Sequence, residues 1–316
     1  MTGLILQIVQ SLSVLLVAPL FTGLVRKIKA RLVGRVGPAL VQPYRDLARL
    51  MRKEAVVAEH ASWLFRSTPY VVFALAWLVA SVVPTFAIGH ALAGVGDLIA
   101  IVALLATARF FLALAGMDIG TSFGGIGASR DLMIASLAEP AMLMVVFSVA
   151  LVAGSTALPT IASFVLTDGI GLEVSLALAL ISVVMVAIAE NGRIPIDNPA
   201  THLELTMVHE AMVLEYSGRH LALIEAAGML RLVIYVSLIA CIFAPWGLAR
   251  AEGAGLADYA VGYAVFVLHL GFAGLALAVF ETSIAKMRVF RVGEFLGAAL
   301  ILALLAVIFS FVSDVF

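Results

Sequence analysis

Residues 189–220 read AENGRIPIDNPATHLELTMVHEAMVLEYSGRH, and they concentrate charge between two strongly apolar stretches of the chain. Gly192, Pro195 and Pro199 break any helix in the first part, whereas the run from Thr201 to Gly218 has no breaker and predicts a helix. An acidic residue at a bilayer centre costs roughly 2.5 kcal/mol or more, so acids retained beside membrane spans are expected to have a function. The acidic residues are Glu190, Asp197, Glu204, Glu210 and Glu215, with only Arg193 and Arg219 as Arg or Lys counterparts.

The composition of the whole chain is that of an integral membrane protein. Of its 316 residues, 63% are hydrophobic and only 12% are charged, whereas a soluble domain carries about 25% charged residues. The formal net charge of −1 gives no basic balance that would favour a nucleic-acid partner. The single cysteine, Cys241, lies in an apolar span, and one cysteine cannot form an internal disulfide or hold an iron–sulfur cluster.

Long apolar stretches predict about eight transmembrane helices in one polytopic domain, residues 1–316. A span needs about 20 apolar residues, and backbone groups in lipid must be bonded within the segment, which favours helices. The alternation expected of a membrane β-barrel is absent from the sequence. The fold class is therefore all-α. The expected spans lie near residues 3–25, 69–89, 96–116, 132–153, 172–189, 220–245, 257–280 and 295–313.

Basic residues are distributed very unevenly between the two sets of loops. Sixteen of the 19 Lys and Arg residues lie in the loops at 26–68, 117–131, 190–219 and 281–294, against only Arg250 in the other set. Because cytoplasmic loops carry an excess of Lys and Arg, we expect these four loops to face the cytoplasm and both termini to lie outside.

The first cytoplasmic loop contains a predicted amphipathic helix. In PYRDLARLMRKEAV (residues 43–56), Leu47, Leu50 and Met51 lie on one side of a helix and the basic residues on the other. This pattern predicts a helix on the membrane surface. Its basic face either lies in water beside the lipid headgroups or docks a cytoplasmic partner.

Familiar catalytic motifs are incomplete in this sequence. His209 and Glu210 begin a zinc-binding pattern, but Val213 occupies the position of its second histidine. The glycine-rich run at residues 123–127 has no preceding strand and no following Lys-Ser/Thr, so it predicts a bent loop rather than a phosphate site. The sequence therefore gives no catalytic or metal-binding residue.

Charges within or beside the spans are the more informative candidates. Glu139 is about two turns into the fourth span, and Asp131 lies eight residues earlier near the same helical face. Arg109, in the third span, is expected to pair with an acid on a neighbouring helix, for which Glu139 is a candidate. Unpaired buried carboxylates have raised pKa values that permit proton exchange near neutral pH. We predict one polar cavity that opens to the cytoplasm and is lined by Arg109, Asp131, Glu139, Glu190, Glu204, Glu210, Glu215, Glu225, Arg231 and Glu281. The expected proton path uses Arg109, Asp131, Glu139, Glu204, Glu210, Glu215 and Glu225.

A purely structural role is the alternative for each of these charges. Glu215 and Arg219, for instance, have the i, i+4 spacing and the order that stabilise a helix as an ion pair.

Four separated segments resemble the subunit 1 family of respiratory complex I. The resemblance is closer still to its branch in membrane-bound group 4 nickel–iron hydrogenases, formate hydrogenlyase subunit 4 and hydrogenase-4 component C. NPATHLELT (residues 198–206) departs from the complex I pattern and resembles this branch. The four segments are GRVGPALVQPYRDLARLMRKE (34–54), FGGIGASRDLMIASLAEPAM (123–142), AENGRIPIDNPATHLELTMVHEAMVLEYSG (189–218) and ETSIAKMRVFRVGEFLGA (281–298).

The resemblance implies a membrane anchor and energy-coupling subunit in the cytoplasmic (inner) membrane of a bacterium or archaeon. Its implied partners are hydrogenase large and small subunits, an iron–sulfur subunit and antiporter-like membrane subunits, besides the lipid bilayer. The nickel–iron centre and iron–sulfur clusters would belong to those partners, with no cofactor on this chain. By the same resemblance, Arg35, Arg45, Asp46 and Glu54 would dock the redox arm, and Glu190, Arg193 and Asp197 would shape the loop facing its large subunit.

Two other functions remain open at this point. A quinone-site subunit of a complex I type NADH-quinone oxidoreductase would share most of these motifs. A stand-alone transporter would be expected to show inverted repeats, which this sequence lacks.

Overall fold

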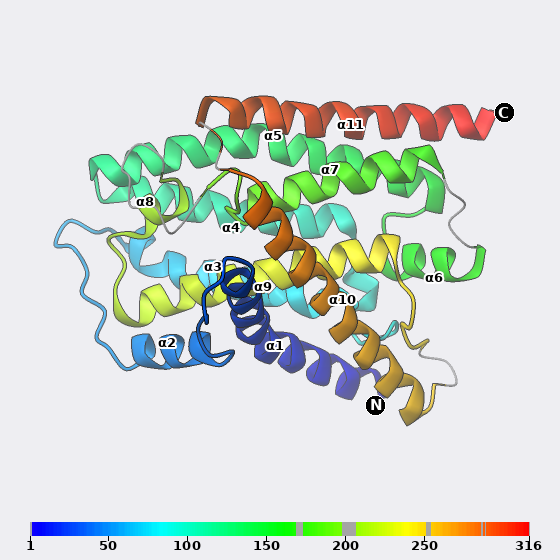
Figure 1. The fold of residues 1–316 in the computed structure, drawn as a ribbon, viewed down its shortest axis with the longest axis horizontal. Helices are drawn as coiled ribbons and strands as arrows, with labels where there is room; N and C mark the ends of the chain where they lie inside the picture. The colour runs from blue at the N-terminus through cyan, green and yellow to red at the C-terminus, as the bar shows by residue number, and fades with distance from the viewer. Residues whose placement is uncertain are drawn as a thin grey trace.

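The structure is a computed structural model that describes residues 2–168, 173–197, 207–250, 254–285, 287 and 289–315 (Figure 1). Every regular element within these ranges is helical, apart from two isolated bridges between single residues. The elements are α1 (Thr2–Leu32), α2 (Gln42–Met51), α3 (Trp63–Val82), the 3-10 turn η1 (Ala93–Val95), α4 (Leu98–Asp118), α5 (Ser122–Ala153), α6 (Leu158–Asp168), α7 (Val174–Glu190), α8 (His209–Val213), α9 (Gly218–Phe243), α10 (Leu256–Ser283) and α11 (Val289–Val315).

Seven helices among the described residues are long and apolar enough to cross a membrane. They are α1, α3, α4, α5, α9, α10 and α11. The remaining predicted span, near 172–189, corresponds to α7, a shorter apolar helix of 17 residues that packs along α5 and α11 (Figure 1). The prediction of an all-helical, multi-pass membrane protein is confirmed.

The four loops rich in basic residues lie at one end of the bundle, where hydrogen bonds join them. We call this the basic end; its described residues are 26–68, 117–131, 190–197, 207–219, 281–285 and 287. Each of the four predicted cytoplasmic loops is bonded to at least one of the others. The bonded pairs are Val56 with Ser217, Ser62 with Asp118, Arg130 with Met207 and Met287 with Pro195.

The connections between the other ends of the spans meet at the opposite end, together with both ends of the chain (Figure 1). Backbone hydrogen bonds there join Gly3 to Ala91, Phe86 to Ala249 and Gly96 to Leu158. A chain whose two ends lie at the same end of the bundle traverses it an even number of times, which requires α7 as the eighth traverse.

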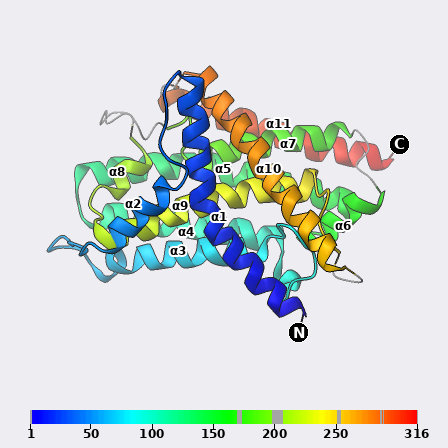
Figure 2. The ribbon, with the colours of Figure 1, turned by 60° about the horizontal axis from the view of Figure 1, so that its bottom comes forward.

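Helices α1 and α10 form an oblique pair across the remaining helices (Figures 1 and 2). Their close approach depends on Gly274 of α10, where an added Cβ would lie 3.0 Å from the ring of Phe21 in α1. Helices α3, α4, α5, α7, α9 and α11 run closer to the long axis, and α9 is among the most buried of them.

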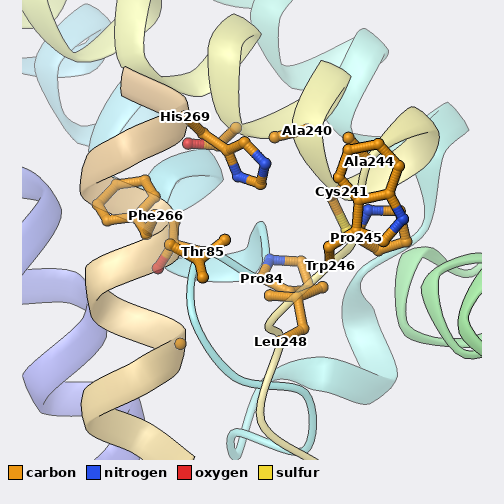
Figure 3. A pocket seen from close by; sticks show the side chains of 13 residues that line it. Pro84, Thr85, Ala240, Cys241, Ala244, Pro245, Trp246, Leu248, Phe266 and His269 are labelled. Atoms are coloured by element: carbon orange, nitrogen blue, oxygen red, sulfur yellow. The ribbon is translucent and has the colours of Figure 1, made fainter. Parts of the chain in front are cut away.

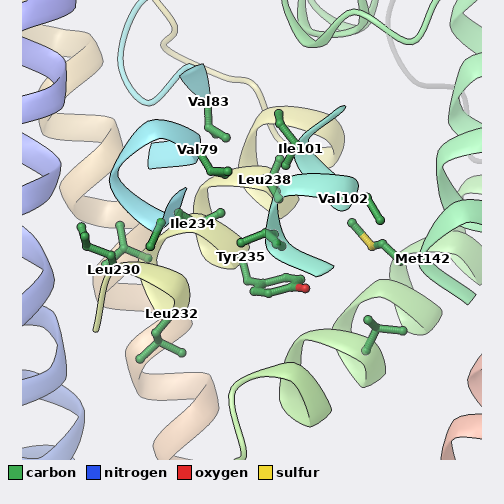
Figure 4. Close-up of a cluster of buried hydrophobic side chains, with 14 of the residues drawn as sticks. Val79, Val83, Ile101, Val102, Met142, Leu230, Leu232, Ile234, Tyr235 and Leu238 are labelled. Atoms are coloured by element: carbon green, nitrogen blue, oxygen red, sulfur yellow. The ribbon is translucent and has the colours of Figure 1, made fainter. Parts of the chain in front are cut away.

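An apolar layer fills the bundle between its two ends. It joins α3, α4, α5 and α9 (Figure 4), and its side chains include Val79, Val83, Ile101, Val102, Met142, Leu230, Ile234 and Leu238. We call these eight residues the apolar layer. Buried apolar side chains of the four helices therefore pack closely together in this region.

Two local predictions at the basic end were wrong. The glycine-rich run at 123–127 is not a bent loop but the start of α5, whose N-cap Thr121 accepts a hydrogen bond from the N–H of Gly124. Its glycines permit close packing, because an added Cβ at Gly124 would lie 2.0 Å from the carbonyl oxygen of Gly116. The fourth predicted span accordingly extends back from residue 132 to Ser122.

The helix predicted from Thr201 to Gly218 is much shorter among the described residues. Within 207–218 only α8, His209–Val213, precedes the start of α9 at Gly218. Residues 214–217 leave the helix because Ser217 exchanges hydrogen bonds with Val56 and Tyr216 stacks on Phe65. The predicted amphipathic helix is present as α2, with Leu47 packed against the core.

Candidate functional site

Arg109 of α4 is the centre of a buried charged cluster near the basic end. The residue is only 3% exposed. Its guanidinium forms an ion pair with Glu190, the last residue of α7, and its Nε lies 3.6 Å from Oδ2 of Asp131 in α5. The cluster therefore ties together three helices that are distant in sequence.

A second guanidinium approaches the same group from α9. Nη1 of Arg231 donates a hydrogen bond of 3.3 Å to the backbone carbonyl of Glu190. Two guanidiniums and two carboxylates thus meet where α4, α5, α7 and α9 converge. Nε and Nη1 of Arg109 have no hydrogen-bond partner within the described part of the chain, so this cluster is not fully satisfied by direct bonds.

A polar cavity of about 50 Å³ adjoins the cluster. One water needs roughly 10–15 Å³ of such space and two to four polar partners, so the cavity accommodates several waters. The polar side chains on its wall are Asp131, Glu190, Asn191, Asp197, His209 and Arg231. Carboxylates beside water-sized space in a buried setting are suited to taking up and releasing protons.

Asp197 builds one wall of this cavity by ordering the start of α8. The residue is 3% exposed, and its Oδ2 accepts hydrogen bonds from the N–H groups of Val208 at 3.3 Å and His209 at 3.2 Å. A carboxylate that satisfies the first N–H groups of a helix stabilises it. Asp197 therefore fixes the position of α8 against α4 and α5, which α8 contacts.

A second ion cluster holds the loop after α7 from the other side. The buried Glu281 of α10 accepts a 2.9 Å bond from Nζ of Lys29, and Nη1 of Arg193 lies 3.7 Å from its other oxygen. Burial lowers the pKa of Arg193, while the charge of Glu281 opposes that change. Arg193 was expected in the loop that faces the redox arm, and no local sequence pattern indicates its partner Glu281, which lies in another segment of the chain.

The remaining candidates for the proton path do not all join one cluster. Arg109 pairs with acids on neighbouring helices as expected, but the suggested partner Glu139 is wrong, because the ion pairs are made by Asp131 and Glu190. Glu139 and Glu225 are partly buried in α5 and α9 and are not on the cavity wall. Glu204 lies outside the described residues.

The acids around α8 differ in their surroundings. Glu210 is half-buried in α8, whereas Glu215 is exposed in the turn that follows it. Because that turn interrupts the helix, Glu215 and Arg219 do not share one helix, and the i, i+4 alternative for this pair loses its basis.

The proposed docking residues of the first loop are on the surface. Arg35, Arg45 and Glu54 are exposed, and Asp46 is half-buried, where it accepts bonds from Gln42 and Arg49. Glu190 and Asp197 are buried instead, so they can influence a docking surface only through the shape of the loop that carries them.

An aromatic pair secures this surface to the bundle. The rings of Tyr216 and Phe65 stack with their centroids 3.9 Å apart, and the Tyr216 hydroxyl donates to the carbonyl of Phe65 at 3.0 Å. Burial raises the pKa of this hydroxyl well above its ordinary value, so it remains a donor.

Within the described ranges, no group of three or more His, Cys, Asp or Glu side chains is arranged to hold a metal ion.

Comparison with known proteins gives matches over nearly the whole chain. Residues 5–312 match the protein family described as NADH dehydrogenase. The chain is 34% identical over 281 residues to formate hydrogenlyase subunit 4 of Escherichia coli (strain K12), covering 89% of this chain and 90% of that protein. It is also 34% identical over 305 residues to hydrogenase-4 component C of the same strain, covering 96% and 95%.

A solved structure shares the fold. It is a chain from the membrane-bound sulfane sulfur reductase, described as an archaeal respiratory membrane complex, and it superposes with a TM-score of 0.81. The sequence identity is 22%, and the alignment covers 98% of this chain and 99% of the other.

Proposed function

The chain belongs to the NADH dehydrogenase subunit 1 family, and we propose that it is the membrane anchor and energy-coupling subunit of a multisubunit, membrane-bound hydrogenase-type complex. The resemblance of its motifs to this family is confirmed. The hydrogenase-type assignment is supported by two relatives at 34% identity, a formate hydrogenlyase subunit and a hydrogenase-4 component, that match over most of both chains.

The observation that carries the coupling role is the buried Arg109 cluster beside a water-sized polar cavity. Buried charges are energetically costly in a membrane protein, so their presence marks a candidate functional site. In the proposed mechanism, a conformational change in the docked redox arm alters the loop after α7. That loop begins at Glu190, so its movement changes the pairing of Glu190 with Arg109 and the proton affinity of the nearby carboxylates. Proton or sodium movement in partner membrane subunits is driven by this change.

The basic end would face the cytoplasm and bind the redox arm. The sixteen Lys and Arg residues of the four loops at 26–68, 117–131, 190–219 and 281–294 support this orientation, which puts both termini outside the cytoplasmic membrane. The partners proposed there are hydrogenase large and small subunits and an iron–sulfur subunit, which would carry the nickel–iron centre and the clusters. Antiporter-like subunits would adjoin the chain within the membrane.

The size of the cavity argues against a quinone at the charged cluster. Ligand pockets usually measure about 300–1,000 Å³, whereas this cavity of about 50 Å³ suits water. If the purified complex reduced quinone as a complex I type enzyme does, the proposal would be contradicted.

The anchoring role is tested by purifying the tagged chain with its partners from membranes in mild detergent. Mass spectrometry should identify iron–sulfur and large subunits, and the eluate should contain nickel and evolve hydrogen. A complex that lacks nickel and reduces quinone would overturn the hydrogenase assignment, and a chain purified alone from membranes where other complexes survive would overturn the anchoring role.

The coupling role is tested separately in sealed vesicles. Asp131→Asn, in the cluster, and Glu139→Gln, two turns farther along α5, should leave assembly and hydrogen evolution intact but reduce the associated ion movement measured with a pH-sensitive or sodium-sensitive dye. Asp258→Asn is the matched control, since Asp258 is an exposed carboxylate in the first turn of α10, outside the cluster and the docking residues. Undiminished ion movement in Asp131→Asn would contradict the role of the cluster.

A further inference from the structure

A second pocket lies on the side of the apolar layer toward the end of the bundle that holds the termini, and Figure 3 shows its lining. It lies between the loop after α3, the last turns of α9 and the middle of α10. Its lining includes Thr85, Ser237, Cys241 and His269. The pocket has a volume of about 10 Å³, close to the roughly 10–15 Å³ occupied by one water.

Two hydroxyl groups on its wall have no protein partner in the described part of the chain. They are Oγ1 of Thr85, a residue 8% exposed, and Oγ of Ser237, a residue 3% exposed. Buried hydroxyls are almost always hydrogen-bonded, because an unpaired one loses its bonds to water without replacement. Two such groups in one pocket therefore indicate a shared polar guest.

The end of α9 supplies an acceptor at the same place. Pro245, also on the pocket wall, has no N–H, so it cannot donate the usual helical bond to the carbonyl of Cys241. Carbonyls at the end of a helix lack intrahelical partners, and Cys241 itself lines the pocket, so its carbonyl is the acceptor available there.

We propose that this pocket is a binding site for one ordered water molecule. The water accepts hydrogen bonds from the hydroxyls of Thr85 and Ser237, and it donates one to the carbonyl of Cys241. Three bonds are typical of a buried water. Water can accept two hydrogen bonds and donate two. The two hydroxyls and the carbonyl use three of these positions, and the second hydrogen of the water remains available for the ring of His269.

The water site lies close, along α9, to the cavity beside the charged cluster. Ser237 is six residues after Arg231, which lines the other cavity, and both are on α9. Six residues span about 9 Å of helix. Ile234, a residue of the apolar layer (Figure 4), lies between Arg231 and Ser237 in α9. Only this thin layer would separate hydrated sites that belong to opposite ends of the bundle.

Hydroxyl-radical footprinting of the complex in native membranes tests the site, because bound water supplies radicals to adjacent side chains. Cys241, the only cysteine of the chain and 2% exposed, should be labelled. Met142 is the matched control, since it is a similarly buried, sulfur-containing residue in the apolar layer at 3% exposed. After each rate is divided by the intrinsic reactivity of the free amino acid, labelling of Met142 should be at least several-fold slower. Equal labelling of the two residues would overturn the proposal.

Thr85→Val provides a second readout, since valine keeps the shape of threonine and removes the hydroxyl. If the pocket holds water, the substitution removes a hydrogen bond, and both the thermal midpoint of the complex and the labelling of Cys241 should fall. If the pocket is dry, the substitution removes an unpaired buried hydroxyl, and the midpoint should rise. A midpoint equal to or above that of the unsubstituted protein would therefore contradict the water site.

Discussion

Replacement of Glu190 by glutamine should destabilise the fold by about 3 kcal/mol, because it leaves the buried Arg109 without its closest carboxylate. Removal of one partner from a buried ion pair typically costs about 3–5 kcal/mol. Asp131 remains at 3.6 Å from Nε, where the attraction is roughly 4–5 kcal/mol at an effective dielectric constant of about 20. This residual attraction puts the expected loss at the lower end of the range.

The assay is reversible unfolding in mild detergent with increasing denaturing detergent, applied to Glu190→Gln, Arg109→Met and the double variant. The coupling energy from this cycle should reach at least about 2 kcal/mol. The same cycle on Asp46 and Arg49, an exposed pair at 3.0 Å, should give about 0.2–1 kcal/mol. If the substitutions at Glu190 and Arg109 were additive within about 0.5 kcal/mol, the assignment of an energetically coupled pair would be refuted.

Three further predictions concern other parts of the fold. Gly218→Ala should destabilise the chain by about 2 kcal/mol or more and increase proteolysis after residue 53, because Gly218 has φ +54° and an added Cβ would lie 2.3 Å from the carbonyl oxygen of Glu54. Lys29→Met should cost about 1–3 kcal/mol in the same unfolding assay, because it removes the closer partner of the buried Glu281; an unchanged midpoint would contradict that contact. Burial lowers the pKa of His90 below its ordinary value of 6.5, so protonation favours the unfolded chain. The contribution of His90 to stability should therefore be constant above about pH 6.5 and should fall as the pH is lowered further. His90→Asn should reduce the drop in the unfolding midpoint between about pH 7.5 and about pH 5.

The sequence was sufficient to predict the helical spans and the grouping of their loops. Hydropathy and the Lys and Arg distribution depend only on local composition, and both remain informative when the helix contacts are unknown. The structure confirms the grouping of the loops through bonds such as those between Val56 of the first loop and Ser217 of the third.

The pairing of charges could not be predicted in the same way. Helical periodicity shows that Asp131 and Glu139 share a face, but it does not show which neighbour Arg109 meets at which depth. Lys29 and Glu281 are 252 residues apart, and no local pattern joins them. The helix expected from Thr201 was wrong among the described residues because the prediction relied on the absence of breakers, whereas Ser217 and Tyr216 have tertiary partners that end α8.

The shortness of α7 makes the candidate site sensitive to membrane thickness. Its 17 residues extend about 26 Å at 1.5 Å per residue, less than the roughly 30 Å hydrocarbon core of a typical bilayer. The bilayer beside α7 must therefore become thinner, unless another apolar helix covers α7. Ile181 and Val184 are exposed on the surface that the lipid or this helix would contact. Because α7 ends at Glu190, a thicker bilayer would apply its stress directly to the carboxylate that pairs with Arg109.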